Sequence, residues 1–263
     1  MSQFFRGRSV GQKTIQSLEK GLDILFLFSE ERPFLTLEEI SSRSGLPKST
    51  CYRFLSTLKN KNILERERTS GKFKLGVRLL KLESVIHNSL GIARIASPFL
   101  QKLSEVSGET AQLVVLNKNE GVCVERVEST ATLRVMPDRG TTIYLHSGAS
   151  GKVIMAYLNP EERSRIIHEK GLKRLTPNTI TAPSALKREL EEIRKRGYAV
   201  SDQEIYQGVK AIAAPIFDFQ GKITASLGVA GPRERLTGKK INSLAPIIKE
   251  AARSISEQLG ADS

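Results

Sequence analysis

The sequence contains little cysteine, little histidine and no long apolar run. Its two cysteines, Cys51 and Cys123, are far apart, so they form neither a disulfide framework nor a cysteine-rich metal site, and free thiols suit a reducing cytoplasm. The three histidines, His87, His146 and His168, are also separated and have no acidic metal-site pattern. We therefore expect no metal, no cofactor and no hydrolase triad. No apolar run reaches the roughly 18 residues of a transmembrane helix, so we expect no membrane partner.

Length and composition indicate a folded chain of about two domains. The 263 residues are enough for two ordinary domains or one large one. With 39% hydrophobic and 26% charged residues, a packed core is expected and global disorder is not. The first residues are basic but lack the apolar core of a signal peptide. We expect residues 1–13 to form a flexible leader.

Positive charge is concentrated in one short segment. The formal net charge is +13, which favours polyanionic partners but also suits a diffuse role in solubility. Residues 1–46 contain six Lys/Arg and six Asp/Glu, whereas residues 47–76 contain eight Lys/Arg against Glu65 and Glu67, a net +6. Solvated helix faces usually mix both signs. The segment therefore predicts a surface for nucleic acid.

Two predicted helices precede the basic segment. Residues 15–28 place five apolar side chains at helical spacing: Ile15, Leu18, Leu22, Leu25 and Phe26. Gly21 weakens this helix by about 1 kcal/mol relative to Ala, so we expect tertiary packing to hold it. A capping box of Thr36 and Glu39 predicts a second helix that ends before Gly45, a residue suited to a left-handed C-terminal cap.

The helix predicted from about Pro47 to Asn60 has two distinct faces. One face is an apolar stripe at helical spacing: Cys51, Phe54, Leu55 and Leu58. The opposite face carries groups that can bond base edges or phosphates: Ser49, Tyr52, Arg53 and Ser56. Helix, glycine turn and split helix are typical of a helix-turn-helix, with the second helix in the major groove.

A basic hairpin follows the helix pair. Residues 63–75 predict two short strands around a turn at 69–71, which is the arrangement of a wing. The alternative is a small helical domain with a charged surface, because two helices around a glycine turn are common. The capping box, the split helix, the hairpin and the localised charge together favour DNA binding.

The chain resembles the IclR family of bacterial regulators over roughly residues 14–259. The matching stretches in this part are IQSLEKGLDIL, LTLEEISSRSGLPKSTCYRFLSTL and GKFKLGVRLLKL. The resemblance implies an α+β protein with a winged helix-turn-helix over 14–76, a linker helix over 77–91 and a GAF-like effector domain over 92–263. The expected DNA-binding residues are Lys48, Ser49, Thr50, Tyr52, Arg53, Ser56, Thr57, Lys59, Arg68, Lys72 and Lys74.

The rest of the chain predicts interleaved helices and strands. Residues 77–96 have a helical pattern that suits either a core helix or a linker ending at Gly91, and Ser97-Pro98 predicts the start of another helix that ends before Gly108. Strands are expected over 112–117, 121–127, 132–136, 209–219 and 223–230, and helices over 149–158, 160–170, 183–196 and 242–259. This mixture without a strict βαβ repeat predicts an α+β domain.

One segment of the second half suggests an anion site. In LHSGASGKVIMAYL (145–158), small residues precede a helix, and the backbone N–H groups of Ala149 and Ser150 suit a carboxylate. The alternative is a tight packing turn. The spacing of Gly151-Lys152 does not match a P-loop, and that of Gly148–Gly151 does not match a nucleophile elbow.

The family resemblance, which continues in RGYAVSDQE (196–204) and in residues 208–232, places an effector pocket here. It implies apolar wall from Val135 and Ile143, polar groups from Ser201 and Asp202, the loop residues Ala149 and Ser150, and a sheet side of Val209, Ala211, Gly228 and Ala230. The small side chains on the sheet side favour an aromatic or sugar-derived effector over a very small acid.

The expected function is that of a transcription regulator, and two other classes remain open. We expect double-stranded operator DNA, a small-molecule effector and self-association as a dimer or tetramer. An enzyme would need a catalytic constellation that the sequence does not show, so we expect none. Structured RNA is the other alternative, although a recognition helix suits a B-form major groove better than the narrow A-form one.

Overall fold

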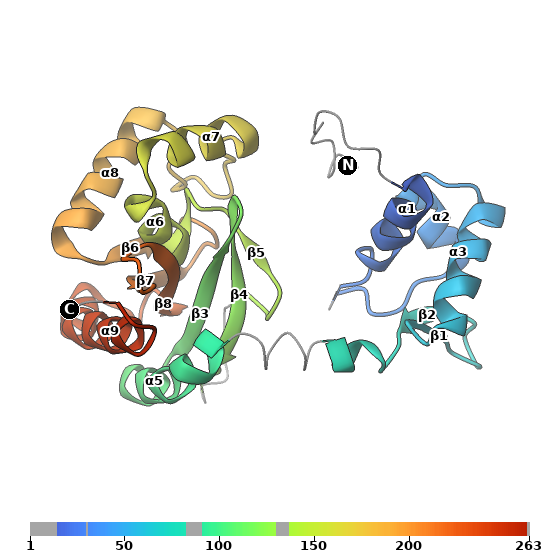
Figure 1. Cartoon of the computed structure of the whole chain (residues 1–263), viewed down its shortest axis with the longest axis horizontal. Coiled ribbons are helices and arrows are strands. Elements are labelled where there is room, and N and C mark those ends of the chain that lie inside the picture. Colours follow the sequence, from blue (N-terminus) through green and yellow to red (C-terminus); the bar gives the residue numbers. More distant parts are fainter. Residues whose placement is uncertain (1–14, 30, 83–90, 130–136, 262–263) are drawn as a thin grey trace. The chain divides into compact units, whose positions relative to one another are not determined.

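The computed structural model describes residues 15–29, 31–82, 91–129 and 137–261 (Figure 1). The chain divides into two compact units, residues 1–89 and residues 90–263. Among the described residues, no helix combines the length and the apolar character needed to cross a membrane.

The first unit contains the predicted helix pair. Helix α1 (Gln16–Leu25) is followed by α2 (Leu37–Ser44) and α3 (Lys48–Asn60). The capping box forms as expected, because Thr36 Oγ1 accepts from the N–H of Glu39 at 3.2 Å and the Glu39 carboxylate accepts from the N–H of Thr36 at 2.8 Å. Gly45 adopts the left-handed conformation (φ +69°) that ends α2 and turns the chain into α3.

The wing is a short antiparallel hairpin. Strand β1 (Leu64–Arg66) pairs with β2 (Phe73–Leu75), with Glu65 opposite Lys74. Leu64 and Phe73 enter the core of the unit, together with the buried side chains of α2 and α3. One face of the hairpin therefore holds it against the helices while its turn extends away from the core.

The apolar side chains of α1 pack differently from the expectation. Ile24 is fully buried and Leu25 is half-buried in the core, but four of the five predicted apolar positions are exposed: Ile15 (68%), Leu18 (59%), Leu22 (43%) and Phe26 (71%). They share one face of the helix because they are three or four residues apart. The expected amphipathic helix is present, but its apolar face is turned away from its own core.

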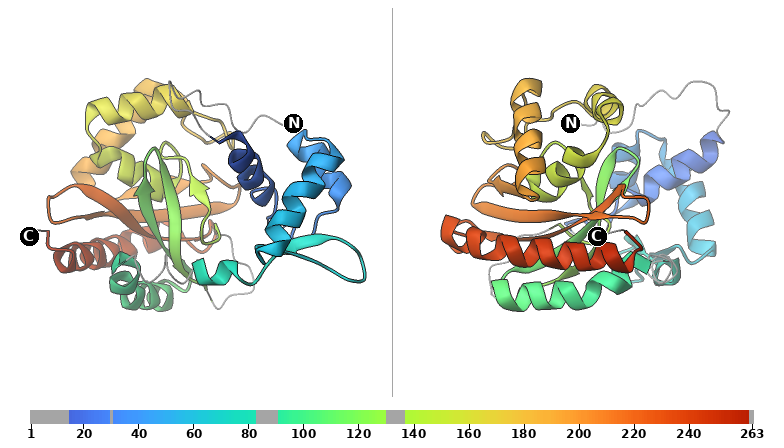
Figure 2. Two further views of the ribbon diagram at one scale, coloured as in Figure 1. Left: turned by 45° about the vertical axis from the view of Figure 1, so that its right-hand side comes forward. Right: turned by 60° about the vertical axis from the view of Figure 1, so that its left-hand side comes forward.

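The second unit is one antiparallel sheet covered by helices on both faces. Its described strands follow the order β5-β4-β3-β8-β7-β6. Their bounds are β3 (Thr110–Asn117), β4 (Glu120–Val127), β5 (Thr142–Ile143), β6 (Ala199–Asp202), β7 (Val209–Phe217) and β8 (Ile223–Pro232). Helices α5 (Gly91–Ser107) and α9 (Gly238–Gln258) lie side by side on one face, as Figure 2 shows.

The other face carries α6 (Gly148–Tyr157), α7 (Pro160–Lys170) and α8 (Pro183–Arg196). Strand alternation divides the side chains between two cores. On β8, Leu227 and Val229 pack toward α5 and α9, whereas Gly228 and Ala230 face the side of α6. The described residues therefore form an α+β fold with a winged helix-turn-helix, as predicted.

Helix α5 begins earlier than the sequence suggested. It starts at Gly91 and runs through Pro98, which lies inside the helix rather than at its start. Ala93, Ala96 and Leu100 are fully buried against the sheet, so packing offsets the hydrogen bond that proline cannot make. The predicted strand 132–136 and most of the predicted linker helix, residues 83–90, lie outside the described residues.

Candidate functional site

The outer face of α3 is polar and mostly exposed. Ser49, Tyr52 and Arg53 are exposed and Ser56 is half-buried, whereas Cys51 is buried on the opposite face. Among the described residues, the side chains of Tyr52 and Arg53 make no hydrogen bond or ion pair within the chain. A donor that is exposed and unpaired on a recognition helix is available to a base edge or a phosphate.

The other predicted DNA-binding residues surround this face and differ in what they contact. Lys48 is ion-paired with Glu38 at 2.9 Å, and Lys74 with Glu65 at 3.4 Å. Thr57 donates its hydroxyl to the carbonyl of Arg53 at 2.9 Å. The remaining predicted residues have no ion pair among the described residues, and they are either exposed (Lys59, Arg68) or half-buried (Thr50, Lys72).

One exposed basic side chain of the segment folds back on the hairpin. Arg66 donates from Nε to the carbonyl of Gly71 at 2.9 Å and lies over the ring of Phe73 at 5.5 Å. It therefore stabilises the hairpin turn instead of extending to a partner. The wing cations whose side chains make no bond to the hairpin turn among the described residues are Arg68, Lys72 and Lys74.

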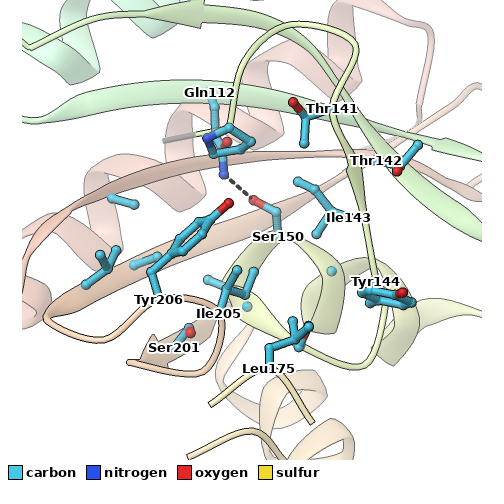
Figure 3. Close-up of a pocket in the computed structure, with 18 residues that line it drawn as sticks. Gln112, Thr141, Thr142, Ile143, Tyr144, Ser150, Leu175, Ser201, Ile205 and Tyr206 are labelled. Carbon is cyan, nitrogen blue, oxygen red and sulfur yellow. Dashed lines mark hydrogen bonds between the residues drawn. The ribbon is translucent and has the colours of Figure 1, made fainter. Parts of the chain in front are cut away.

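A cavity of about 290 Å³ lies in the second unit between the start of α6 and the α6 side of the sheet (Figure 3). Its walls come from β3, β5, β6, β7 and β8 and from the loops at 137–147, 175 and 205–206. Most of the lining is apolar, including Ile143, Leu175, Ile205 and Val209. An enclosed apolar space with a few polar groups is the usual form of a small-molecule site.

The structure brings together most of the predicted effector residues. The cavity is lined by Ile143, Ala149, Ser150, Ser201, Val209, Ala211 and Ala230. Gly228 lies directly behind Ser150, and Val135 is outside the described residues. Asp202 does not line the cavity: its carboxylate is 3.3 Å from Lys210 Nζ and 3.0 Å from Arg233 Nε. Along β6 adjacent side chains face opposite sides, so Ser201 and Asp202 cannot both face the cavity.

The first turn of α6 supplies backbone donors to the cavity. Gly148 has φ +72°, and its N–H donates to the Glu204 carboxylate at 3.2 Å. The N–H groups of Ala149 and Ser150 follow, and at the start of a helix they have no partner within the helix. Ser147 precedes them and makes no capping bond with its side chain. This end of the helix therefore favours an anionic group.

Among the described residues, two polar atoms of the lining are buried and have no hydrogen-bond partner. They are Gln112 Oε1 and Ser147 Oγ. The amide of Gln112 donates from Nε2 to Ser150 Oγ at 3.0 Å, which fixes its position on β3 (Figure 3). Sequence reasoning missed Gln112, Ser147, Tyr144 and Tyr206, all of which line the cavity. A buried polar atom without a partner is costly, so these two atoms are candidate hydrogen-bonding positions for a ligand.

A buried ionic cluster supports the start of α6. Lys152, 1% exposed, contacts the carboxylates of Glu204 at 2.5 Å and Glu189 at 3.1 Å and the carbonyl of Val200 at 2.8 Å. Arg196 pairs with the same oxygen of Glu189 at 3.0 Å. Burial raises the pKa of Glu204, and the charge of Lys152 opposes that rise. Because the charges balance, the cluster leaves no net charge behind the cavity.

In the part of the chain that the structure describes, no group of three or more His, Cys, Asp or Glu side chains could hold a metal ion.

The comparisons with known proteins agree with the geometry of both units. The IclR helix-turn-helix domain matches residues 17–68, and the C-terminal domain of bacterial IclR transcriptional regulators matches residues 84–257. The chain belongs to the IclR family.

Curated relatives of this IclR-family protein are similar over nearly the whole chain. The transcriptional regulator BhcR of Paracoccus denitrificans is 35% identical over 242 residues, which cover 92% of this chain and 86% of BhcR. The transcriptional repressor IclR of Escherichia coli is 30% identical over 248 residues, or 94% of this chain and 90% of that one.

Solved structures agree. Thermotoga maritima IclR superposes with a TM-score of 0.77 at 32% identity, covering 93% of this chain and 99% of that one. An IclR homologue of Microbacterium hydrocarbonoxydans in complex with 4-hydroxybenzoate superposes with a TM-score of 0.80 at 29% sequence identity. The superposition covers 92% of this chain and 98% of that one. This IclR-family protein is therefore a transcriptional regulator with a DNA-binding helix-turn-helix and a C-terminal effector-binding domain.

Proposed function

We propose that this regulator binds a palindromic operator as a dimer, and that an aromatic monocarboxylate in the cavity changes its affinity for that operator. The observation that carries the proposal is the Ser147 hydroxyl at the start of α6, which is buried without a partner among the described residues in a mostly apolar cavity. A carboxylate can bond this hydroxyl and the N–H groups of Ala149 and Ser150, while an aromatic ring fills the apolar volume.

The size of the cavity limits the effector. Its volume of about 290 Å³ lies at the lower end of the roughly 300–1,000 Å³ that small-molecule sites span, which suits a single ring better than a large ligand. The apolar walls favour an aromatic body over a sugar. The relative whose structure holds 4-hydroxybenzoate gives the same ligand class. Ser150 contacts the amide of Gln112, which is no general base, so we propose binding without turnover.

The proposed division of labour on DNA follows the exposure of the side chains. Ser49, Tyr52 and Arg53 read bases in the major groove, with Ser56 beside them. The cations of α3 and the wing bind phosphates together with the two threonines of α3: Lys48, Lys59, Arg68, Lys72, Lys74, Thr50 and Thr57. Lys48 and Lys74 exchange exposed ion pairs for phosphate, which costs little because such pairs contribute little to stability.

The exposed apolar face of α1 supports the proposed dimer. Four large apolar side chains on one face of a helix are more than isolated surface residues, and such patches mark interaction sites. A second copy meeting this face would place two recognition helices on one palindrome. We further propose that residues 77–91 link the domains, and that the protein acts in the cytoplasm, where its operator DNA is found.

Capture of sheared genomic DNA by the purified full chain tests the proposal. We expect a few enriched sites that share a palindrome, and we expect millimolar benzoate or hydroxybenzoates to change their recovery. The ligand acts only through different affinities for the bound and free arrangements. Uniform recovery with and without these acids would overturn the proposal, and loss of the acid during incubation would favour an enzyme.

A further inference from the structure

We propose that Gln112 makes the cavity selective for effectors that carry a hydroxyl group, because its side-chain carbonyl accepts a hydrogen bond from the ligand. The inference rests on the proposed effector site and names a feature of the ligand that the carboxylate and the ring leave open. It concerns a group on β3, whereas the carboxylate is expected at the start of α6.

The Gln112 amide is held by burial and by a hydrogen bond from its nitrogen. Its side chain is 6% exposed, and Nε2 donates to Ser150 Oγ at 3.0 Å. An amide that donates through its nitrogen presents its oxygen as an acceptor only. That oxygen is buried at the cavity and has no partner within the described part of the chain. The pocket therefore offers an acceptor that only a donor can satisfy.

Gly228 makes this arrangement possible. It is the cross-strand neighbour of Gln112 on β8. A Cβ at Gly228 would lie 3.3 Å from Ser150 Oγ and 2.9 Å from the carbonyl oxygen of Ile212. The absent side chain leaves room for Ser150 to meet Gln112. On the sheet side of the cavity, the Gln112 amide thus supplies a polar group held in place, whereas the side chains of Ala211 and Ala230 supply none.

The hydroxyl of Tyr206 points toward the same part of the cavity (Figure 3). Tyr206 extends across the cavity toward the Gln112–Ser150 bond (Figure 3). It is 47% exposed, and no hydrogen bond joins it to Gln112. A ligand that displaces solvent from the Gln112 oxygen without donating to it leaves a buried acceptor unpaired, and sites with such groups discriminate strongly against ligands that lack the hydroxyl.

Paired ligands test the selectivity without a mutation. Calorimetric titration of the full chain compares benzoate with its three hydroxybenzoate isomers and the three matching methoxybenzoates, which can accept but not donate. We expect one hydroxy isomer to bind at least about tenfold more tightly than benzoate, the effect of one well-made buried hydrogen bond. The matching methoxy compound is expected to bind no better than benzoate.

Two variants assign the effect. In Gln112→Met, of similar size but without the amide, we expect the hydroxyl advantage to fall to within about twofold. Benzoate should bind this variant at least as tightly as it binds wild type, because it no longer leaves a buried acceptor unpaired. Tyr206→Phe is the matched control and should retain the advantage. If Tyr206→Phe removes the advantage and Gln112→Met does not, the assignment to Gln112 is wrong.

The remaining outcomes separate the two proposals. Equal affinity of benzoate and every hydroxybenzoate overturns the inference and leaves the proposed effector class in place. Tighter binding of a methoxy compound overturns it as well, because the amide would then be donating. Binding of none of these acids overturns the proposed effector class, and the inference falls with it.

Discussion

The ammonium of Lys152 and the carboxylate of Glu204 form an ion pair in which both side chains are less than one-tenth exposed. The same carboxylate accepts the N–H of Gly148. The start of α6, which lines the candidate effector cavity, is therefore held by a buried charge pair.

Replacing the cation alone should destabilise the second unit. Lys152→Met leaves Glu204 buried without its counter-charge, and we expect a loss of about 3–5 kcal/mol in the free energy of unfolding, measured in urea. The double variant Lys152→Met/Glu204→Gln keeps an acceptor for Gly148 and removes both charges, so it should recover most of the loss. A double variant as unstable as the single one would show that packing around Lys152, and not its charge, is what matters.

Stability should fall below pH 6.5 because of His146. Burial lowers the pKa of His146 from its ordinary value of 6.5, and the bond between its Nε2 and the carbonyl of Lys173 at 3.0 Å opposes this only in part. As the pH falls below 6.5, the unfolded chain takes up the proton more readily than the native one, so unfolding becomes more favourable. Above 6.5 this contribution to stability is fully present.

Matched variants isolate the histidine. His146→Gln can still donate to Lys173 and should flatten the dependence of the unfolding free energy on pH between 5 and 7.5, a window set by the titration of histidine. His168→Gln, at an exposed position, should leave the wild-type slope unchanged. An unchanged slope in His146→Gln would assign the dependence to other groups.

A charge on the exposed face of α1 should disrupt the dimer. Leu18→Glu places a carboxylate in the proposed apolar interface, and we expect the dimer dissociation constant in sedimentation experiments to rise at least about tenfold. Gln16→Glu puts the same charge on the opposite face of the helix and should have little effect. Dimers of undiminished affinity in Leu18→Glu would place the interface elsewhere.

Arg53 and Lys59 should affect DNA binding in different ways. If Arg53 contacts a base, Arg53→Ala should cost about 1–3 kcal/mol on the captured operator and far less on random DNA. Lys59→Ala should weaken both about equally and reduce the salt dependence by about one unit of slope. Equal losses for Arg53→Ala on both DNAs would make it a phosphate contact.

Local sequence signals were enough to place many helices. The bounds of α7 and α8 match the prediction because Pro160 and Pro183 stand at their first positions, and Gly171 and Gly197 follow their last. Proline and glycine act within one turn of the chain, so their effect does not depend on the rest of the fold. The capping box at Thr36 succeeded for the same reason.

The sequence predictions failed where packing between distant parts of the chain decides the structure. The stripe on α1 shows that one face is apolar but not whether the chain's own core covers it, and Ile24 fills that core instead. Pro98 predicted a helix start, yet buried contacts carry α5 through it. The stretch QLVVLN did not identify Gln112 as a cavity residue, because its face of the strand borders a cavity only once α6 lies across the sheet.

Each of the two units contains one buried cysteine, whose reactivity reports on the unfolding of that unit. Cys51 lies in the core of the first unit and Cys123 in the second, and both are buried. Burial also raises the pKa of Cys123 to about 11, so little reactive thiolate forms near neutral pH. A thiol reagent should therefore label each cysteine only when its own unit unfolds. The labelling rates of Cys51 and Cys123 in the wild-type protein thus report separately on the unfolding of the DNA-binding unit and of the effector-binding unit, without any engineered probe.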